Sequence, residues 1–334
     1  MKKNIYINGL SNISPQETFY QPMGATIAPP QGAFFTCQEP NYKEFIQKKL
    51  LRRMSRIVRM GLATAHKALD DANNPSLDAI ISGTAWGCVK DTEKFLETII
   101  ENKEAYLTPT AFVQSTHNTV AGQIALLHHN NCYNMSYVQG NVSFESALID
   151  AMLLFYDNKA NNILVNGIDE QTEKLGILLE RLECAKAGVR VMGEGAACFI
   201  LSDQPTPNTY AKVAGVNMLY RPKDKTAVQQ SIQHTLQEAN IPLEAIDVVL
   251  TGNKTLAIEK ELFPTADYSQ YKTLCGEYPT STAFAMAVGA QVLKGDLPTK
   301  TALGIHKKAP KHILIYNNHQ DINHSIILLS KVSA

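Results

Sequence analysis

Segments with the character of β-strands alternate with segments of helical character along almost the whole chain. The strand segments are short apolar runs that end in small or polar residues, and the helical segments carry apolar residues at intervals of three and four. This alternation is typical of α/β proteins, in which helices cover the faces of a sheet. Strands are expected at 3–10, 78–85, 134–140, 161–170, 195–203, 210–219, 245–253, 312–318 and 324–331. Helices are expected at 43–71, 91–102, 116–129, 144–157, 224–240 and 281–295.

The strand and helix pattern restarts after Pro205 and Pro207. At 334 residues the chain is long enough for one large α/β unit or for two related halves. The restart favours two halves of related topology, residues 1–205 and residues 206–334, although no sequence identity between them is visible.

The charge and hydropathy of the chain exclude several classes of partner. The formal net charge is zero, whereas binding to nucleic-acid phosphates relies on a clustered excess of Lys and Arg. No stretch reaches the ~18 consecutive apolar residues that a membrane helix needs, and the apolar run at the start is too short for a signal peptide. We therefore expect a cytoplasmic protein that neither binds nucleic acid nor inserts into a membrane. The short basic stretch at 48–53 is interpreted as a solvated helix face, or as a rim that meets an acidic protein.

Neither the cysteines nor the histidines are spaced like metal ligands. The six cysteines form no CxxC pair, and the nine histidines form no HExxH pattern. Most of the cysteines are therefore expected to be small buried side chains. The sequence predicts no metal site and no cofactor.

Several segments, in the right order, resemble the β-ketoacyl synthase branch of the thiolase fold. The most specific match is the GEGA sequence within residues 191–201. Three further segments are similar to the family, namely the long helix at 52–72, the stretch at 108–126 before the nucleophile strand, and the stretch at 271–293 that begins near the family lysine. The resemblance implies an α/β, thiolase-like fold of two pseudo-equivalent halves with layered α-β-α-β-α architecture, here with shortened loops.

The family places a cysteine nucleophile at a turn between a strand and a helix, where the helix N-terminus stabilises the thiolate. At this position the chain carries Gln139, directly before the predicted helix at 144–157. A carboxamide cannot be acylated, so no acyl-enzyme is expected there. Cys132 lies upstream at the start of the strand, on the wrong end for the helix dipole, and is expected to be an inert thiol.

Two histidines of the family, which assist decarboxylation and stabilise the enolate, also have no counterpart here. The first falls on or beside Gly252, and the second is replaced by Glu277, while the family lysine is retained as Lys272. A carboxylate at 277 repels an enolate, and a Lys272–Glu277 ion pair is the plain structural interpretation. The family's glycine-rich loop is absent near Asn323, and His319 has no nucleophile to activate.

These losses match what is known of chain-length-factor subunits, which keep the fold, lose the cysteine and pair with an active ketosynthase. The resemblance implies a catalytically silent subunit of a heterodimer, which shapes the acyl tunnel of its partner while polyene, polyketide or fatty-acid-type chains grow on an acyl carrier protein. The chain is similar to the partner subunits of bacterial aryl-polyene and flexirubin-type pigment systems. The predicted interface and tunnel residues are Phe112, Val113, His117, Asn118, Tyr133, Met135 and Tyr137. Their alternative role is that of ordinary dimer-core residues.

Three other functions stay open on the sequence. The chain could be a homodimeric ketosynthase-fold protein that binds an acyl or small-molecule ligand in the former tunnel. It could be a malonyl decarboxylase of the type that carries glutamine in place of cysteine, although such enzymes retain both histidines. It could also be an acyltransferase that uses another cysteine.

Overall fold

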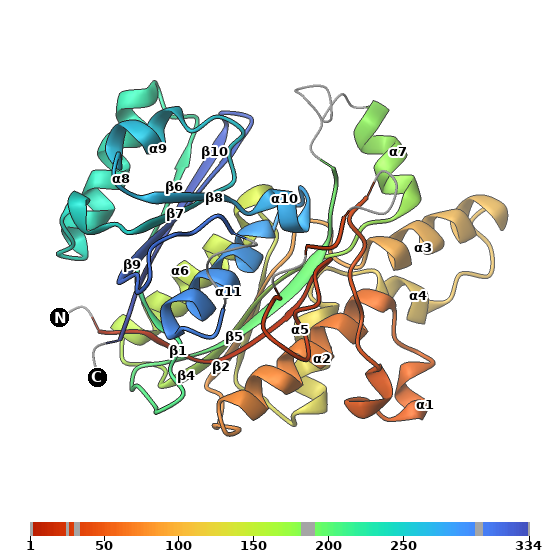
Figure 1. Cartoon of the computed structure of the whole chain (residues 1–334). Helices are drawn as coiled ribbons and strands as arrows, with labels where there is room; N and C mark the ends of the chain where they lie inside the picture. The colour runs from red at the N-terminus through yellow and green to blue at the C-terminus, as the bar shows by residue number, and fades with distance from the viewer. Residues whose placement is uncertain (1–2, 25–26, 30–33, 182–190, 298–302, 333–334) are drawn as a thin grey trace.

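The computed structural model describes residues 3–24, 27–29, 34–181, 191–297 and 303–332, and its described strands form a ten-stranded sheet (Figure 1). The strand order is β3-β2-β4-β5-β1-β6-β10-β9-β7-β8. The strands of the first half are β1 (Tyr6–Ile13), β2 (Ala79–Gly83), β3 (Tyr133–Tyr137), β4 (Asn162–Asp169) and β5 (Gly195–Ser202). Those of the second half are β6 (Ala211–Tyr220), β7 (Val248–Thr251), β8 (Asp267–Gln270), β9 (His312–His319) and β10 (Asn323–Ser330).

The two sets of five strands have the same topology. From its outer edge inward, the first set runs β3-β2-β4-β5-β1 and the second runs β8-β7-β9-β10-β6. In both sets the three outer strands are parallel, and the last two pairs are antiparallel. A short antiparallel pairing of β1 with β6 joins them. The repeat in strand order lies on either side of residue 205, and the boundary there stays a prediction.

Helices lie in three layers between and outside the two strand sets (Figure 1). The central layer holds α6 (Ser143–Tyr156) and α11 (Ser281–Lys294), whose buried side chains pack with residues from both strand sets. One outer layer holds α2 (Arg56–Asp71) and α5 (Thr119–Leu127), and the other holds α8 (Lys225–Glu238) and α9 (Ala257–Leu262). The three apolar cores between these layers confirm the thiolase-like α-β-α-β-α architecture expected from the sequence.

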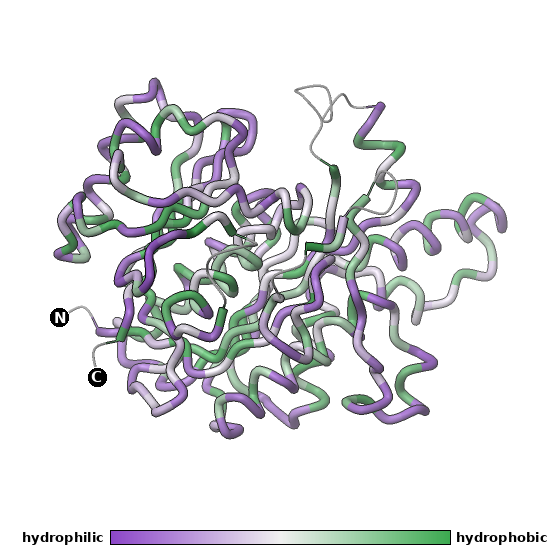
Figure 2. Tube along the Cα trace, in the orientation of Figure 1, coloured by the Kyte–Doolittle hydropathy of each residue, from purple (hydrophilic) through white to green (hydrophobic). Residues whose placement is uncertain are grey.

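The burial of each helix follows its pattern of apolar residues. α11 is apolar or small on all sides, and 12 of its 14 residues are buried, as a helix between two sheets requires. It ends at Gly295, whose φ of 93° is left-handed and suits glycine. α2 is apolar on one side only and covers one face of the first strand set. Figure 2 shows the apolar residues concentrated in the central strands and helices.

The prediction of a single long helix over 43–71 is wrong. This stretch forms a 3-10 turn at Tyr42–Glu44, the short α1 (Lys48–Leu51) and then α2. Ser55 has an extended backbone, with ψ of 168°, at the N-cap position of α2, and serine favours such a cap. The four cations at 48–53 also repel one another along a continuous helix.

The remaining helices lie at the ends of the strands. They are α3 (Val89–Glu101), α4 (Pro109–Gln114), α7 (Glu173–Arg181) and α10 (Lys272–Cys275). α7, α9, α10 and β8 were not expected from the sequence; α9, α10 and β8 are too short for periodicity to indicate them. In the part of the chain that the structure describes, no helix has the length and apolar content that a membrane crossing demands.

Candidate functional site

The turn between β3 and α6 carries Gln139. β3 ends at Tyr137, and Gly140, with φ of 58°, opens a 3-10 turn that leads into α6. The Gln139 backbone N–H donates to Ser143 Oγ at 2.9 Å, and Ser146 Oγ donates to Gln139 Oε1 at 2.5 Å. The carboxamide is therefore held by its own helix at the strand–turn–helix position that the sequence predicted.

None of the cysteines that the structure describes lies at this turn. Cys132 is exposed and precedes β3 at the end opposite Gln139. Cys37, Cys88 and Cys198 are buried, and burial raises the pKa of each of these thiols, to about 12 for Cys88. Such thiols are poor nucleophiles because only the thiolate reacts. Cys184 lies outside the described residues.

Gly252, at the end of β7, lies in a space that other side chains already fill. A Cβ atom built on Gly252 lies 2.1 Å from Asn317 Oδ1 and 2.8 Å from the Tyr271 hydroxyl. Both of these side chains are buried. An imidazole at position 252 therefore requires Asn317 to move, so the position predicted for the first histidine is closed by packing as well as by sequence.

The predicted ion pair between Lys272 and Glu277 is present. Lys272 Nζ lies 2.7 Å from Glu277 Oε1, and the lysine side chain is only 2% exposed. His319 Nδ1 lies 3.9 Å from the same oxygen. The Lys272 ammonium group is therefore paired with the Glu277 carboxylate, beside position 252, where packing leaves no room for a histidine.

The GEGA segment fixes the backbone of the Glu277 loop. Gly193 N–H donates to Glu277 C=O at 3.0 Å, and Glu277 N–H donates to Val191 C=O at 2.9 Å. A Cβ on Gly193 would lie 1.9 Å from the Cys275 carbonyl oxygen, so only glycine permits this approach. The GEGA motif therefore holds the Glu277 loop in place beside the site.

Glu194, the acidic residue of this motif, is buried and accepts several hydrogen bonds. The Arg56 guanidinium forms a two-pronged pair with it, with both N–O distances at 2.5 Å. The backbone N–H groups of Cys37 and Gln171 donate to the same carboxylate at 2.9 Å. Glu39, which is partly exposed, contacts the other side of the guanidinium. This pair ties α2 to the segment before β5.

Glu145 is a buried carboxyl in the central layer that the sequence analysis missed. Neither of its oxygens has a hydrogen-bond partner among the described residues. Burial raises the pKa of Glu145, and the Ser325 and Thr282 hydroxyls and the charge of Lys272 oppose this shift. A glutamate in the first turn of the largely apolar helix segment 144–157 was the signal in the sequence.

Glu170, just after β4, is buried near Asp91 and Glu194, and burial raises its pKa to about 7. Because the unfolded carboxyl titrates near pH ~4.3, the folded protein binds the extra proton between these values, and the contribution of Glu170 to stability falls as pH rises. Glu170→Gln keeps the acceptor for the Lys90 N–H. We expect it to raise the free energy of unfolding by about 2 to 3 kcal/mol at pH 8 and by little at pH 5.

Urea denaturation at both pH values measures this difference. Glu101→Gln, at an exposed carboxylate of α3, is the control and should leave the two curves of the parent protein unchanged. An equal effect of Glu170→Gln at pH 5 and pH 8 would contradict the raised pKa.

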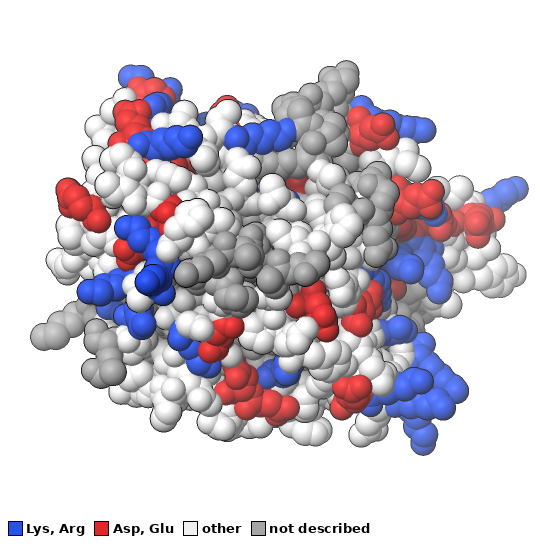
Figure 3. Space-filling view, in the orientation of Figure 1, with Lys and Arg blue, Asp and Glu red and all other residues white. Residues whose placement is uncertain are grey.

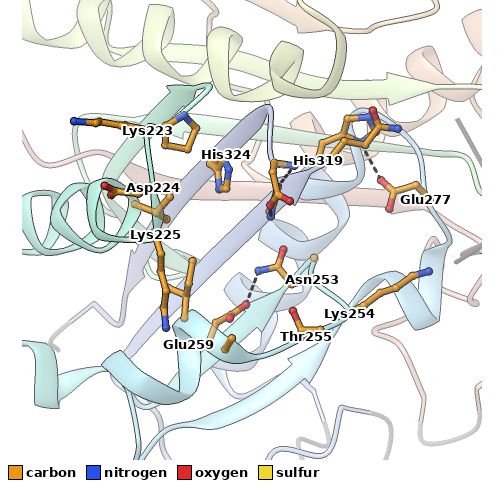
Figure 4. A pocket seen from close by; sticks show the side chains of 18 of the residues that line it. Lys223, Asp224, Lys225, Asn253, Lys254, Thr255, Glu259, Glu277, His319 and His324 are labelled. Carbon is orange, nitrogen blue, oxygen red and sulfur yellow. Dashed lines mark hydrogen bonds and ion pairs between the residues drawn. The ribbon is translucent and has the colours of Figure 1, made fainter. Parts of the chain in front are cut away.

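A cavity of about 680 Å³ opens beside Gly252 and Glu277 (Figure 4). It lies between the β9–β10 turn, the start of α8 and the loop that leads into α9. Glu259 and His324, which the sequence analysis missed, lie in its wall away from Glu277. Its lining is Met192, Pro222, Lys223, Asp224, Lys225, Val228, Gly252, Asn253, Lys254, Thr255, Ala257, Ile258, Glu259, Glu277, Asn318, His319, Gln320, Asp321 and His324.

The predicted interface residues on β3 lie at the outer edge of the sheet. The Tyr133 hydroxyl donates to Asp150 of α6 at 3.0 Å, whereas the Asn134 side chain donates to a carbonyl of α5. Tyr133, Met135 and Tyr137 therefore share the side of β3 that faces α6, because side chains alternate along a strand. Met135 is 40% exposed, which is high for a large apolar side chain on a strand.

The other predicted interface residues lie in α4 or in the short segment that joins it to α5. Phe112 and Val113 are 56% and 61% exposed, and the Phe112 ring packs on Phe95 of α3 at 5.6 Å between centroids. Asn118 precedes α5 as its N-cap residue, and His117 is exposed beside it. The seven predicted residues thus form two groups, one on β3 and one in α4 and the segment before α5.

The charged side chains are mixed over the face seen in Figure 3, except for a group of Lys and Arg over α1. These are the exposed residues Lys48, Lys49, Arg52 and Arg53. Among the residues described, no cluster of three His, Cys, Asp or Glu side chains is placed to hold a metal ion.

Comparison with known proteins gives a family and a set of similar folds. Residues 31–262 match the family model described as "Beta-ketoacyl synthase, N-terminal domain". No curated protein sequence matches the chain.

Three solved structures illustrate the similar folds. The ishigamide ketosynthase/chain length factor is similar at 18% identity and a TM-score of 0.80, over 99% of this chain and 100% of that one. A chain from the complex of a type II PKS acyl-carrier protein with its ketosynthase bound to the hexaketide, AntDE:AntF, has 14% identity and a TM-score of 0.80, over 99% and 100%. A β-ketoacyl synthase from Burkholderia phymatum STM815 has 14% identity and a TM-score of 0.79, over 99% and 100%. At these identities the likeness concerns the fold.

Proposed function

The chain belongs to the β-ketoacyl synthase family, and from this premise we propose that it is a non-catalytic subunit of the chain-length-factor type. In this role it pairs with an active, cysteine-bearing ketosynthase and shapes the acyl tunnel of that partner. The chain that grows there is carried by an acyl carrier protein. The fold similarity to a ketosynthase/chain length factor supports the proposal at the level of architecture.

The observation that carries the proposal is Gln139 at the turn between β3 and α6. The carboxamide oxygen accepts a hydrogen bond from Ser146, and the backbone N–H is bonded to Ser143. A side chain held in this way has no nucleophilic atom to offer to a thioester. The turn keeps the geometry of a nucleophile position without the nucleophile.

The surroundings of the turn support the loss of decarboxylation and condensation chemistry. Position 252 has no room for an imidazole unless Asn317 moves. The carboxylate of Glu277 is paired with Lys272, and it disfavours a developing enolate. Both observations weigh against a malonyl decarboxylase, whose chemistry needs the two histidines.

The edge of the sheet at β3 supports the pairing part of the proposal. An edge strand has main-chain groups free on one side, and β3 carries the exposed apolar side chains of Tyr133 and Met135 on the face toward α6. Phe112 and Val113 on α4 and Tyr133 and Met135 on β3 are exposed apolar side chains of the kind that partners cover. The cytoplasmic location expected from the sequence stays a prediction.

Product length tests the tunnel role. When the chain is co-expressed with its ketosynthase, Phe112→Ala and Tyr137→Ala are expected to lengthen the product, because each removes a bulky side chain from the proposed end of the partner's tunnel. Mass spectrometry of the released chains measures the shift.

The control for product length is Leu178→Ala on α7, where an exposed apolar side chain lies away from β3. An unchanged product distribution in both interface variants, with pairing intact, would overturn the tunnel role. A stable homodimer that never pairs with a ketosynthase would support the binding-protein alternative instead.

A further inference from the structure

The end of the cavity that lies away from Glu277 is built from the second half of the chain alone. It is formed by the loop and helix at 253–259, the start of α8, and His324 on β10. Figure 4 shows Glu259 and His324 on the wall of the same cavity, with Asn253 between them. None of these three residues belongs to the positions discussed for catalysis or pairing, so neither role explains this end of the cavity.

Glu259 is 1% exposed, and its two oxygens differ in their contacts. Oε1 accepts hydrogen bonds from the Thr251 hydroxyl at 2.6 Å and from Asn253 Nδ2 at 2.7 Å. Oε2 has no hydrogen-bond partner, and the carboxylate has no ion pair, among the described residues. A buried acceptor without a hydrogen bond costs free energy, so a donor from a ligand would stabilise Oε2.

His324 is 3% exposed and also has one nitrogen without a hydrogen bond. Its Nδ1 lies 2.8 Å from the hydroxyl of Tyr316, which is fully buried. Because that hydroxyl needs an acceptor for its proton, it donates to Nδ1, and the neutral ring then carries its proton on Nε2. Burial lowers the pKa of His324, and the charge of Asp321 opposes this only in part, which favours the neutral ring.

Two residues of the cavity wall thus carry an acceptor and a donor that have no hydrogen-bond partner among the described residues. Ala257, Ile258 and Val228 form apolar parts of the same wall. The cationic side chains in the lining, Lys223, Lys225 and Lys254, nearly match the acidic ones in number, so the site does not favour a strongly charged ligand.

We propose that this end of the cavity binds a small neutral polyol, whose hydroxyl groups donate to Glu259 Oε2 and accept from His324 Nε2–H. A hydroxyl is the neutral group that can both donate and accept. Both atoms are buried, but both belong to residues that line the cavity, so a ligand reaches them when the two side chains rotate toward it. The site is independent of the pairing role, since it shares no residue with β3 or α4.

The test uses three probes built on one six-membered carbon ring, namely myo-inositol, cyclohexanol and cyclohexylamine. Titration of the full chain by ligand-observed NMR is expected to show myo-inositol binding in the millimolar range, as suits a small ligand. Glu259→Gln is expected to weaken this binding about tenfold, because the amide oxygen stays with the two donors at the Oε1 position, and the NH2 group at the Oε2 position cannot accept a hydrogen bond. His324→Phe is expected to weaken it similarly.

Glu244→Gln, at an exposed carboxylate outside the cavity, is the matched control and should leave the affinity for myo-inositol unchanged. Thermal unfolding of each variant separates loss of binding from loss of fold. Equal binding of myo-inositol to the parent protein and to Glu259→Gln would overturn the proposal. So would binding of cyclohexylamine in preference to myo-inositol, which would mark a cation site, or no binding of myo-inositol to the folded parent protein.

Discussion

Replacing Glu194 by glutamine is expected to lower the free energy of unfolding by about 3 kcal/mol, the low end of the range for breaking one side of a buried ion pair. Glu194 is 2% exposed and accepts two hydrogen bonds from Arg56 and two from backbone N–H groups. Arg56 is 21% exposed and keeps its contact with Glu39, which limits the loss. Urea denaturation followed by circular dichroism measures the change.

Glu39→Gln is the matched control, because Glu39 contacts the same guanidinium from a partly exposed position. This change is expected to cost less than about 1 kcal/mol, as exposed ion pairs do. If both substitutions lower the free energy of unfolding equally, the buried Glu194–Arg56 pair does not stabilise the fold more than the partly exposed Glu39 contact does. Since Glu194 lies in the GEGA motif beside the Glu277 loop, its loss should also loosen that loop.

The double substitution Phe112→Asp and Val113→Asp is expected to abolish pairing with the ketosynthase, with a loss of affinity of at least about 100-fold. Two buried carboxylates without partners are incompatible with an apolar interface. In the unpaired chain both side chains are more than half exposed, so its stability should change little. Co-purification with a tagged ketosynthase, together with thermal unfolding of the free chain, measures both effects.

Tyr220→Asp is the control for the pairing surface. Tyr220 is 68% exposed but lies at the end of β6, far from β3 in the strand order. This substitution should leave pairing intact. Retained pairing in the Phe112/Val113 double variant would place the interface elsewhere on the molecule.

The strand and helix order of this chain could be predicted because its signals are local. Apolar runs such as the one at 78–85, and the helix of small and apolar residues at 281–295, are enough to place the layers. The broken helix at 43–71 could not be predicted from periodicity alone. Its break coincides with the extended backbone of Ser55 and with the distant contact between Arg56 and Glu194.

The candidate site was predictable in part. Gln139 and Glu277 stand in sequence contexts that resemble a known family, so their places could be predicted from the resemblance. The closure of position 252 by Asn317 could not, because the two residues lie on different strands. Glu145 and Glu259 were missed for the same reason, since a sequence does not show whether a carboxyl finds a partner in the fold.

Native mass spectrometry of the co-expressed complex, after incubation with an acylated carrier protein, tests the central claim most directly. We expect a heterodimer in which one acyl group is attached to the partner ketosynthase and none to this chain. An acyl adduct on this chain, for instance at the exposed Cys132, would contradict it. So would the absence of any complex between the two proteins.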